Sequence, residues 1–325
     1  MNKKNSITVS APGKLMLFGE HAVVYGHPCV VTAVDQRMQV TVETLETFEF
    51  ILDAPDVKVL NYKKQLSDLG KGEIPKGAKF VEIAVKNFAK KHGLKFGLKI
   101  ITKSEFSSQF GFGSSSASTV CVLKALSVLS GKNLSEKKLF DLAYKTVLDI
   151  QGKGSGFDVA AAIYGGTLYF LTGGKIMKPL KIKKLPLLVA YSGVKADTVT
   201  LMNQVSILSK KYPKIINHLY QNIEETVDLA KKAMLQYRWL TVGELMNVNQ
   251  GYLEALGVST QKLSDMIYAV RDAGGYGAKL SGAGGGDCII AIAPKEKIAA
   301  VKKSIVKVGG EIIELTTNAE GVRVE

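Results

Sequence analysis

Gly111-Phe112-Gly113-Ser114-Ser115-Ser116-Ala117-Ser118 is the stretch that most constrains the interpretation of this 325-residue chain. It leads into an apolar segment, residues 120–129, which ends before Gly131 and predicts a helix. Glycine backbone approaches a ligand closely, and a helix start offers free N–H groups and the positive end of its dipole to phosphate. The serine hydroxyls add groups that bind phosphate oxygens or a metal. The stretch predicts a nucleotide-binding loop, with a Gly/Ser linker that merely caps a helix as the alternative.

The composition indicates a soluble globular protein that is large enough for two domains. Hydrophobic residues make up 46% and charged residues 22% of the chain, and no apolar run is long enough to cross a bilayer. Cys29, Cys121 and Cys288 are scattered, lack metal or redox spacing, and favour a reducing cytoplasm. The net charge is +14, but the lysines are spread rather than striped, so we expect no nucleic-acid partner and no membrane partner.

Hydrophobic periodicity predicts an α+β protein with two subdomains. The expected strands are 7–11 (ending at Pro12), 38–42, 98–101, 167–171, 288–293 and 311–315. The expected helices are around 80–88, 120–129, 139–150, after 158, 197–209, 214–235, 239–255, 260–273 and 295–307. The polar, turn-rich stretch 173–184 is the expected boundary, which divides the chain into residues 1–178 and 179–325.

Three glycine-rich loops, at 111–118, 152–156 and 282–286, predict a cleft lined for phosphate. Neither the Walker lysine motif nor the Rossmann glycine fingerprint occurs, so the nucleotide site is of another type. The third loop, Ser281-Gly282-Ala283-Gly284-Gly285-Gly286-Asp287, loses much conformational entropy on folding. Close approach of its backbone to a ligand would explain that cost.

Four charged or titratable residues are candidates for chemistry. Lys14 follows the first strand and could supply a point charge to phosphate, or be a surface lysine in a turn. Glu20 and His21 lie inside an apolar stretch, which favours a cleft or a buried pair. Asp158 follows the second loop and precedes a helical segment, where it could act as a general base or simply as an N-cap.

Three motifs in order, residues 11–26, 111–118 and 279–287, resemble the GHMP kinase superfamily over essentially the whole chain. The resemblance implies an N-terminal domain like ribosomal protein S5 domain 2 and a ferredoxin-like C-terminal domain, with ATP between them. The segments 18–26, 243–250 and 255–259 are most similar to those of mevalonate kinases. The implied activity is phosphorylation of the primary hydroxyl of mevalonate by ATP and Mg²⁺.

The resemblance also implies roles for individual residues. Asp158 matches the general base, Lys14 the lysine beside it, and Ser115 a ligand of Mg²⁺. Glu20, His21 and Thr198 match positions on the substrate side. The implied ATP-binding residues are Gly111, Gly113, Ser114, Ser115, Ser116, Ala117, Gly282, Ala283, Gly284 and Gly285.

The carboxylate ligand of Mg²⁺ does not match cleanly. The family's metal-binding glutamate corresponds to Val147 by strict counting, and Asp149 is the nearest carboxylate. Mg²⁺ would use Asp149 after a local shift, or mainly Ser115, ATP and water.

Three alternatives to mevalonate kinase remain open at this point. Residues 154–162 and 281–288 look more like phosphomevalonate kinase, which is the first alternative. Another small-molecule kinase of the superfamily and a non-catalytic metabolite-binding regulator are the others. The sequence leaves the oligomeric state, including a homodimer, undetermined.

Overall fold

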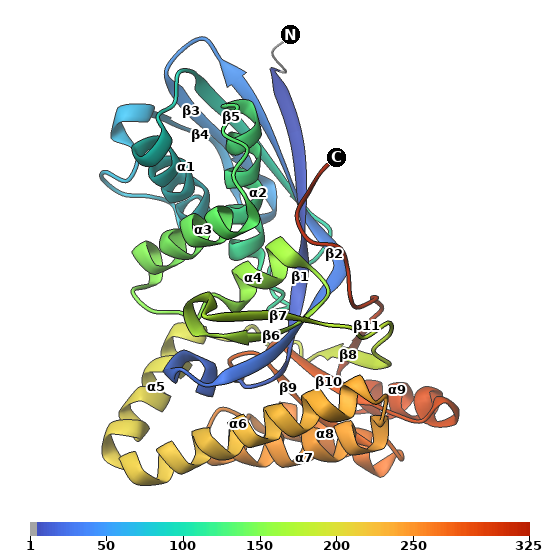
Figure 1. Ribbon diagram of the computed structural model, residues 1–325. Helices are drawn as coiled ribbons and strands as arrows, with labels where there is room; N and C mark the ends of the chain where they lie inside the picture. The colour runs from blue at the N-terminus through green and yellow to red at the C-terminus, as the bar shows by residue number, and fades with distance from the viewer. Residues whose placement is uncertain (1–4) are drawn as a thin grey trace.

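The computed structural model describes residues 5–325, and two β-sheets organise this part of the chain (Figure 1). The larger sheet has the strand order β12-β1-β2-β5-β3-β4, with β6 paired to β2 and β7 paired to β6. Its strands are β1 (Ser6–Phe18), β2 (Pro28–Leu45), β3 (Glu49–Ala54), β4 (Val59–Gln65), β5 (Gly97–Ser104), β6 (Thr167–Leu171), β7 (Ile176–Leu180) and β12 (Arg323–Val324). The smaller sheet, β11-β8-β10-β9, contains β8 (Leu187–Tyr191), β9 (Gly277–Ser281), β10 (Cys288–Ile292) and β11 (Glu311–Ile313).

The first strand is longer than the sequence predicts. The prediction that β1 ends at Pro12 is wrong. The strand continues to Phe18 and pairs with β2 along its whole length. The register shifts between Pro12 and Gly13, so the proline lies at an irregularity of the ladder, where its missing N–H is tolerated. Lys14 therefore lies within a strand and is buried, rather than exposed in a turn.

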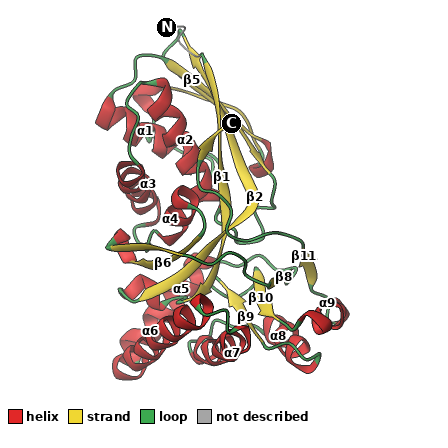
Figure 2. Ribbon diagram, turned by 45° about the vertical axis from the view of Figure 1, so that its right-hand side comes forward, coloured by secondary structure: helices red, strands yellow, loops and turns green. Residues whose placement is uncertain are grey.

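Four helices cover one face of the larger sheet (Figures 1 and 2). They are α1 (Lys79–His92), α2 (Ser114–Leu129), α3 (Glu136–Gln151) and α4 (Phe157–Tyr164). All four were predicted, and α2 begins at Ser114, six residues before the expected apolar segment. Its residues from Ser116 to Leu123 are all buried, because it packs between the sheet and α1 and α3.

The second half contains five helices (Figure 2). They are α5 (Thr198–Lys211), α6 (Pro213–Leu235), α7 (Trp239–Ala255), α8 (Gln261–Asp272) and α9 (Ile298–Lys307). Of these, α7, α8 and α9 pack on the smaller sheet, α6 packs on α7, and α5 packs on α6. Each overlaps a predicted helix, and the ends of α6 and α7 agree to within one residue. The strands β10 and β11 were also predicted, whereas β8 and β9 were missed.

The region between the halves contains more regular structure than expected. Residues 173–184 include β7, whose Pro179 and Leu180 pair with β6, so the expected division at residue 178 falls inside a strand. The C-terminal strand β12 returns to pair with β1 of the first sheet. We propose that the domain boundary lies just after β7.

Within residues 5–325, no helix combines the length and apolar character needed to span a bilayer. The three cysteines are buried, and none of them forms a disulfide.

Candidate active site

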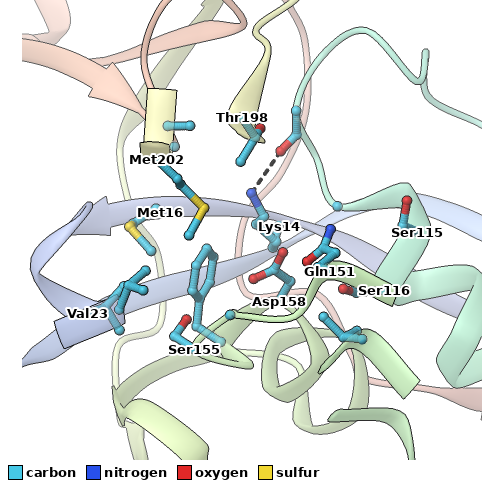
Figure 3. A pocket seen from close by; sticks show the side chains of 18 of the residues that line it. Lys14, Met16, Val23, Ser115, Ser116, Gln151, Ser155, Asp158, Thr198 and Met202 are labelled. Atoms are coloured by element: carbon cyan, nitrogen blue, oxygen red, sulfur yellow. Dashed lines mark hydrogen bonds between the residues drawn. The ribbon is translucent and has the colours of Figure 1, made fainter. Parts of the chain in front are cut away.

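A cavity of about 250 Å³ lies where the two halves meet, and all three glycine-rich loops reach it (Figure 3). Gly111 and Gly113 come from the first loop, Gly154 to Gly156 from the second, and Gly282 and Ala283 from the third. Segments separated by more than 100 residues therefore meet at one site, as the sequence predicted.

The start of α2 faces this cavity. Gly113 is the N-cap, with a left-handed φ of +81° that favours glycine, and Ser114, Ser115 and Ser116 of the first helical turn line the cavity. A 16-residue helix directs its N–H groups and dipole toward this end. Ala117 is buried behind the loop and is not among the lining residues.

Lys14 and Asp158 lie beside each other in the centre of the cavity (Figure 3). The Lys14 ammonium donates to the carbonyl oxygen of Gly111 at 2.8 Å and lies 5.3 Å from the centre of the Phe157 ring. A methyl group added to Gly113 would lie 3.3 Å from Cε of Lys14 and 3.6 Å from Cβ of Asp158. The glycine therefore lets Lys14 pack closely against the first loop.

The structure excludes the N-cap interpretation of Asp158. Gly156 is the N-cap of α4, and Asp158 lies in the first turn with its side chain in the cavity (Figure 3). Asp158 is partly exposed, and its carboxylate lies next to the Lys14 side chain (Figure 3). This is a position from which it could accept a proton from a bound hydroxyl.

Glu20 forms a buried ion pair with Lys279 that joins the two halves of the chain. Both side chains are 0% exposed, and the ammonium donates to Oε1 of Glu20. Burial raises the pKa of Glu20 and lowers the pKa of Lys279, while the attraction between the two charges opposes both shifts. The expectation of a buried pair is thus met, but with Lys279 rather than with the adjacent histidine.

His21 lines the cavity and contacts the third loop. Its Nε2 lies 2.9 Å from the carbonyl oxygen of Ala283, which only accepts hydrogen bonds, so Nε2 carries the proton. Burial lowers the pKa of His21 below its usual 6.5, which favours the neutral ring. Nδ1 of the neutral ring is then an acceptor, suited to a ligand hydroxyl.

The glycines of the third loop serve two different purposes. Gly282 and Ala283 line the cavity, whereas Gly284 and Gly285 are not among the lining residues. A Cβ on Gly284 would lie 2.2 Å from the Val258 carbonyl oxygen, and one on Gly285 would lie 2.7 Å from Leu201. Internal packing thus accounts for these two glycines, which the sequence had linked to a ligand.

Asp287 is a cavity residue that the sequence did not single out. Its Oδ1 accepts from the Ala196 N–H at 2.9 Å and from the Lys195 ammonium at 3.2 Å. A Cβ on Gly111 would lie 2.3 Å from its Oδ2, so the first loop approaches this carboxylate only because residue 111 is glycine. Asp287 therefore fixes the distance between the first loop and the segment that precedes α5.

The structure does not bring Asp149 to the cavity, which corrects its assignment as a metal ligand. Its carboxylate accepts from Lys145 at 2.6 Å and Asn87 at 2.9 Å. Desolvation alone would raise the pKa of Asp149, but the hydrogen bonds from Lys145 and Asn87 outweigh it and lower the pKa below its usual value. Val147 and Gln151, on the neighbouring face of α3, line the cavity instead. Among residues 5–325, no cluster of three or more His, Cys, Asp or Glu side chains forms a metal site.

The remaining wall contains the start of α5 and several apolar side chains. Thr198, the first residue of α5, lies across the cavity from Asp158, as Figure 3 shows. Met16, Val23 and Met202 form an apolar side that the sequence analysis missed, because such residues are indistinguishable from core residues in a sequence.

Two family models match this chain, one in each half. The model described as the GHMP kinases N terminal domain matches residues 79–166, and that described as GHMP kinases C terminal matches residues 230–310. Together they define the class indicated by the fold and the three loops, a GHMP kinase.

Comparison with curated relatives indicates to which branch of the GHMP kinases this chain belongs. The chain is 33% identical to a mevalonate kinase of Pyrococcus abyssi over 98% of each chain, and 35% identical to one of Thermococcus onnurineus over the same share. The crystal structure of Methanococcus jannaschii mevalonate kinase superposes with a TM-score of 0.81 at 28% identity, covering 97% of this chain and 99% of that one. The chain therefore belongs to the mevalonate kinase branch of the GHMP kinase family.

Proposed function

We propose that this protein transfers the γ-phosphoryl group of ATP to the primary hydroxyl of mevalonate, giving 5-phosphomevalonate and ADP. The observation that carries the proposal is that Lys14 and Asp158 line one cavity side by side, together with the start of α2, in a chain whose relatives are mevalonate kinases. A base, a cation and a phosphate-binding helix start are the parts that phosphoryl transfer needs.

ATP would bind with its phosphates against the first loop. The N–H groups and hydroxyls of Ser114, Ser115 and Ser116 supply donors, and the helix dipole favours the negative charge. Gly282 and Ala283 would close the opposite side of the phosphate chain. We retain Gly111 and Gly113 as residues that allow this approach, and assign Ala117, Gly284 and Gly285 to the support of the loops.

Asp158 would accept the proton of the primary hydroxyl as its oxygen attacks the γ-phosphorus. The bond from the γ-phosphorus to the bridging oxygen breaks, and ADP leaves with that electron pair. Lys14 would neutralise charge developing on the transferred group. The hydrogen bond from Lys14 to the Gly111 carbonyl oxygen holds the ammonium group in place. Since this partner is a neutral carbonyl and not a carboxylate, the positive charge of Lys14 is not neutralised by it.

The donor set fits a magnesium ion bound mainly through ATP. Mg²⁺ prefers oxygen ligands and keeps several waters. The Ser115 hydroxyl would therefore be a sufficient protein ligand, because the phosphates of ATP and water supply the other oxygens. When bound, the ion would neutralise phosphate charge. Asp149 has no part in this proposal.

Mevalonate would occupy the side of the cavity away from the first loop. His21 would accept from a hydroxyl through Nδ1, and Thr198 would contact the substrate from α5. Met16, Val23 and Met202 provide an apolar surface for the methyl branch of the substrate. We assign Glu20 an indirect role, because its side chain is 0% exposed and its Oε1 is paired with Lys279; its Oε2 has no hydrogen-bond partner in the described residues 5–325.

Phosphomevalonate kinase, the first alternative, has less support. Its resemblance in residues 154–162 and 281–288 is local, whereas the curated relatives that cover the whole chain are named mevalonate kinase. The presence of both Lys14 and Asp158 in the cavity also argues against a regulator without catalysis. ATP and mevalonate are water-soluble metabolites, so we place the reaction in the cytoplasm, with no nucleic-acid or membrane partner.

The test is a parallel assay of the purified protein with ATP, Mg²⁺ and either mevalonate or phosphomevalonate. ADP release that follows mevalonate concentration supports the proposal. A preference for phosphomevalonate selects the alternative, and ADP release that depends on neither compound refutes both.

A further inference from the structure

Gln151 is the polar side chain of the cavity wall that α3 forms. Val147 and Gln151 are four residues apart on this helix, so they share one of its faces, and both line the cavity. Asp149 lies between them in the sequence, but Lys145 and Asn87 bind its carboxylate outside the cavity. Of the two residues on the cavity face, only Gln151 has a side chain that forms hydrogen bonds, so it is the group through which α3 would contact a polar ligand.

The Gln151 amide is directed into the cavity, although the residue as a whole is exposed (Figure 3). Gln151 is the last residue of α3, and Gly152 ends the helix with a left-handed φ of +72°. A Cβ on Gly154 would lie 3.7 Å from Cγ1 of Val147 and 3.9 Å from Oε1 of Gln151. The chain therefore turns back past this face of α3 on its way to Asp158, and the amide lies beside the second glycine-rich loop.

The position of the amide indicates which part of the reactants it would contact. Figure 3 shows it between the Asp158 carboxylate and the Ser115 side chain, with Ser116 next to it. The phosphates of ATP are assigned to the start of α2, and the attacking hydroxyl is assigned to Asp158. The γ-phosphoryl group passes from the first of these positions to the second. Gln151 therefore borders the path of the transferred group.

The charges around this position favour a neutral hydrogen-bond donor. Asp158 and the phosphates of ATP are negative, so both would repel a carboxylate at residue 151. A glutamine amide has no net charge and carries two N–H donors. Donors that are already in place where charge develops on the phosphoryl oxygens stabilise the transition state of phosphoryl transfer.

We propose that the Gln151 amide donates a hydrogen bond to an oxygen of the γ-phosphoryl group, which makes Gln151 a further catalytic residue. The inference rests on the proposed function, in particular on ATP as the phosphoryl donor. It assigns the polar group of the α3 wall to the transferred phosphate, whereas Ser115 and the other phosphates hold the metal ion. ADP lacks the γ-phosphoryl group, so the contact distinguishes ATP from ADP.

The test compares Gln151→Met with Gln236→Met. Methionine keeps the length and the helix propensity of glutamine but donates no hydrogen bond. Loss of a hydrogen bond to a charged oxygen should weaken the binding of AMP-PNP, a non-hydrolysable ATP analogue, roughly 10- to 100-fold in isothermal titration with Mg²⁺. The affinity for ADP should be unchanged. Gln236, the exposed C-cap of α6, is not among the residues that line the cavity, so Gln236→Met should bind both nucleotides as the wild type does.

Steady-state kinetics provide a second readout. In Gln151→Met, kcat/KM for ATP should also fall roughly 10- to 100-fold, while the KM for mevalonate is unchanged and the melting temperature stays close to that of Gln236→Met. Equal losses of affinity for AMP-PNP and ADP, an unchanged affinity for AMP-PNP, or a raised KM for mevalonate would overturn the inference while the proposed function stands. A wild-type protein without mevalonate-dependent ADP release refutes the proposed function, and the two titrations then still decide whether Gln151 binds the γ-phosphoryl group.

Discussion

The buried pair of Glu20 and Lys279 makes a quantitative prediction about stability. Replacing Lys279 by methionine keeps the length of the side chain but leaves the Glu20 carboxylate without its cation at 0% exposure. Removing one partner of a buried ion pair costs about 3–5 kcal/mol, because the remaining charge is neither solvated nor neutralised. Since this pair joins β9 to the loop after β1, its loss should weaken the contact between the two halves.

The expected change in melting temperature follows from the length of the chain. An unfolding entropy of roughly 2.1 cal/mol/K per residue gives about 0.7 kcal/mol/K for 325 residues. Lys279→Met should therefore lower the melting temperature by roughly 4–7 °C in calorimetry at pH 7.5. The double variant Glu20→Gln/Lys279→Met removes both charges and should recover most of the loss.

The stability of Lys279→Met should depend on pH in a definite direction. Burial already raises the pKa of Glu20 above its usual 4.5, and loss of Lys279 removes the main opposing effect. A carboxyl group whose pKa is higher in the folded than in the unfolded protein destabilises the fold once the pH exceeds its unfolded-state pKa. The loss of melting temperature in Lys279→Met should therefore be smaller at pH 5 than at pH 7.5. Lys307→Met, at an exposed position of α9, is the matched control and should change the melting temperature by about 1 °C or less. A Lys279→Met protein as stable as this control, or a double variant no better than the single one, would refute the reasoning.

Three further changes test the site itself. Asp158→Asn should reduce kcat roughly 10²–10⁴-fold with ATP affinity unchanged, and near-normal turnover by the folded variant would remove Asp158 from its role as base. Gly111→Ala should destabilise the protein by more than the roughly 1–2 kcal/mol cost of an alanine in the left-handed conformation, because its Cβ would lie 2.3 Å from Asp287 Oδ2. Adding Asp287→Gly should recover the part of the destabilisation that exceeds this cost, as measured by thermal unfolding. No recovery in the double variant would contradict the contact. Burial lowers the pKa of His21, so the KM for mevalonate should stay constant down to pH 6.5 and rise only in more acid solution. A KM that begins to rise above pH 6.5 in the wild type, but not in His21→Gln, would argue against a neutral His21 ring.

Much of this fold is predictable from the sequence, for identifiable reasons. The helices α1, α3 and α6 place apolar residues at a period of 3.6, so their existence could be predicted. The ends of α6 agree to within one residue, whereas α1 extends four residues beyond the predicted end and α3 begins three residues before the predicted start. The short strands β3, β4, β7, β8 and β9 were missed, because five to seven residues give too few alternations to distinguish a strand from a loop or a buried helix. The irregularity at Pro12 hid the second half of β1, and with it the buried position of Lys14.

The site was predictable where a local pattern carries the chemistry, and not where distant partners decide it. The three loops, Lys14, His21 and Asp158 meet as expected because glycine-rich turns beside helix starts have a local signature. The partners of Glu20 and Gly111, which are Lys279 and Asp287, lie over 170 residues away, so local patterns cannot reveal them. Asp149 was misplaced because a two-residue step on a helix turns a side chain well away from the face of Val147.

The central claim is that Lys14 and Asp158 mark the point where ATP and mevalonate meet. The most direct measurement is a crystal structure with Mg²⁺, a non-hydrolysable ATP analogue and mevalonate. The account predicts the γ-phosphate between the start of α2 and Lys14, with the primary hydroxyl of mevalonate in hydrogen-bond contact with Asp158. A nucleotide bound elsewhere, for example in the second cavity beside Tyr164 and Lys181, or a mevalonate hydroxyl directed away from Asp158, would contradict it.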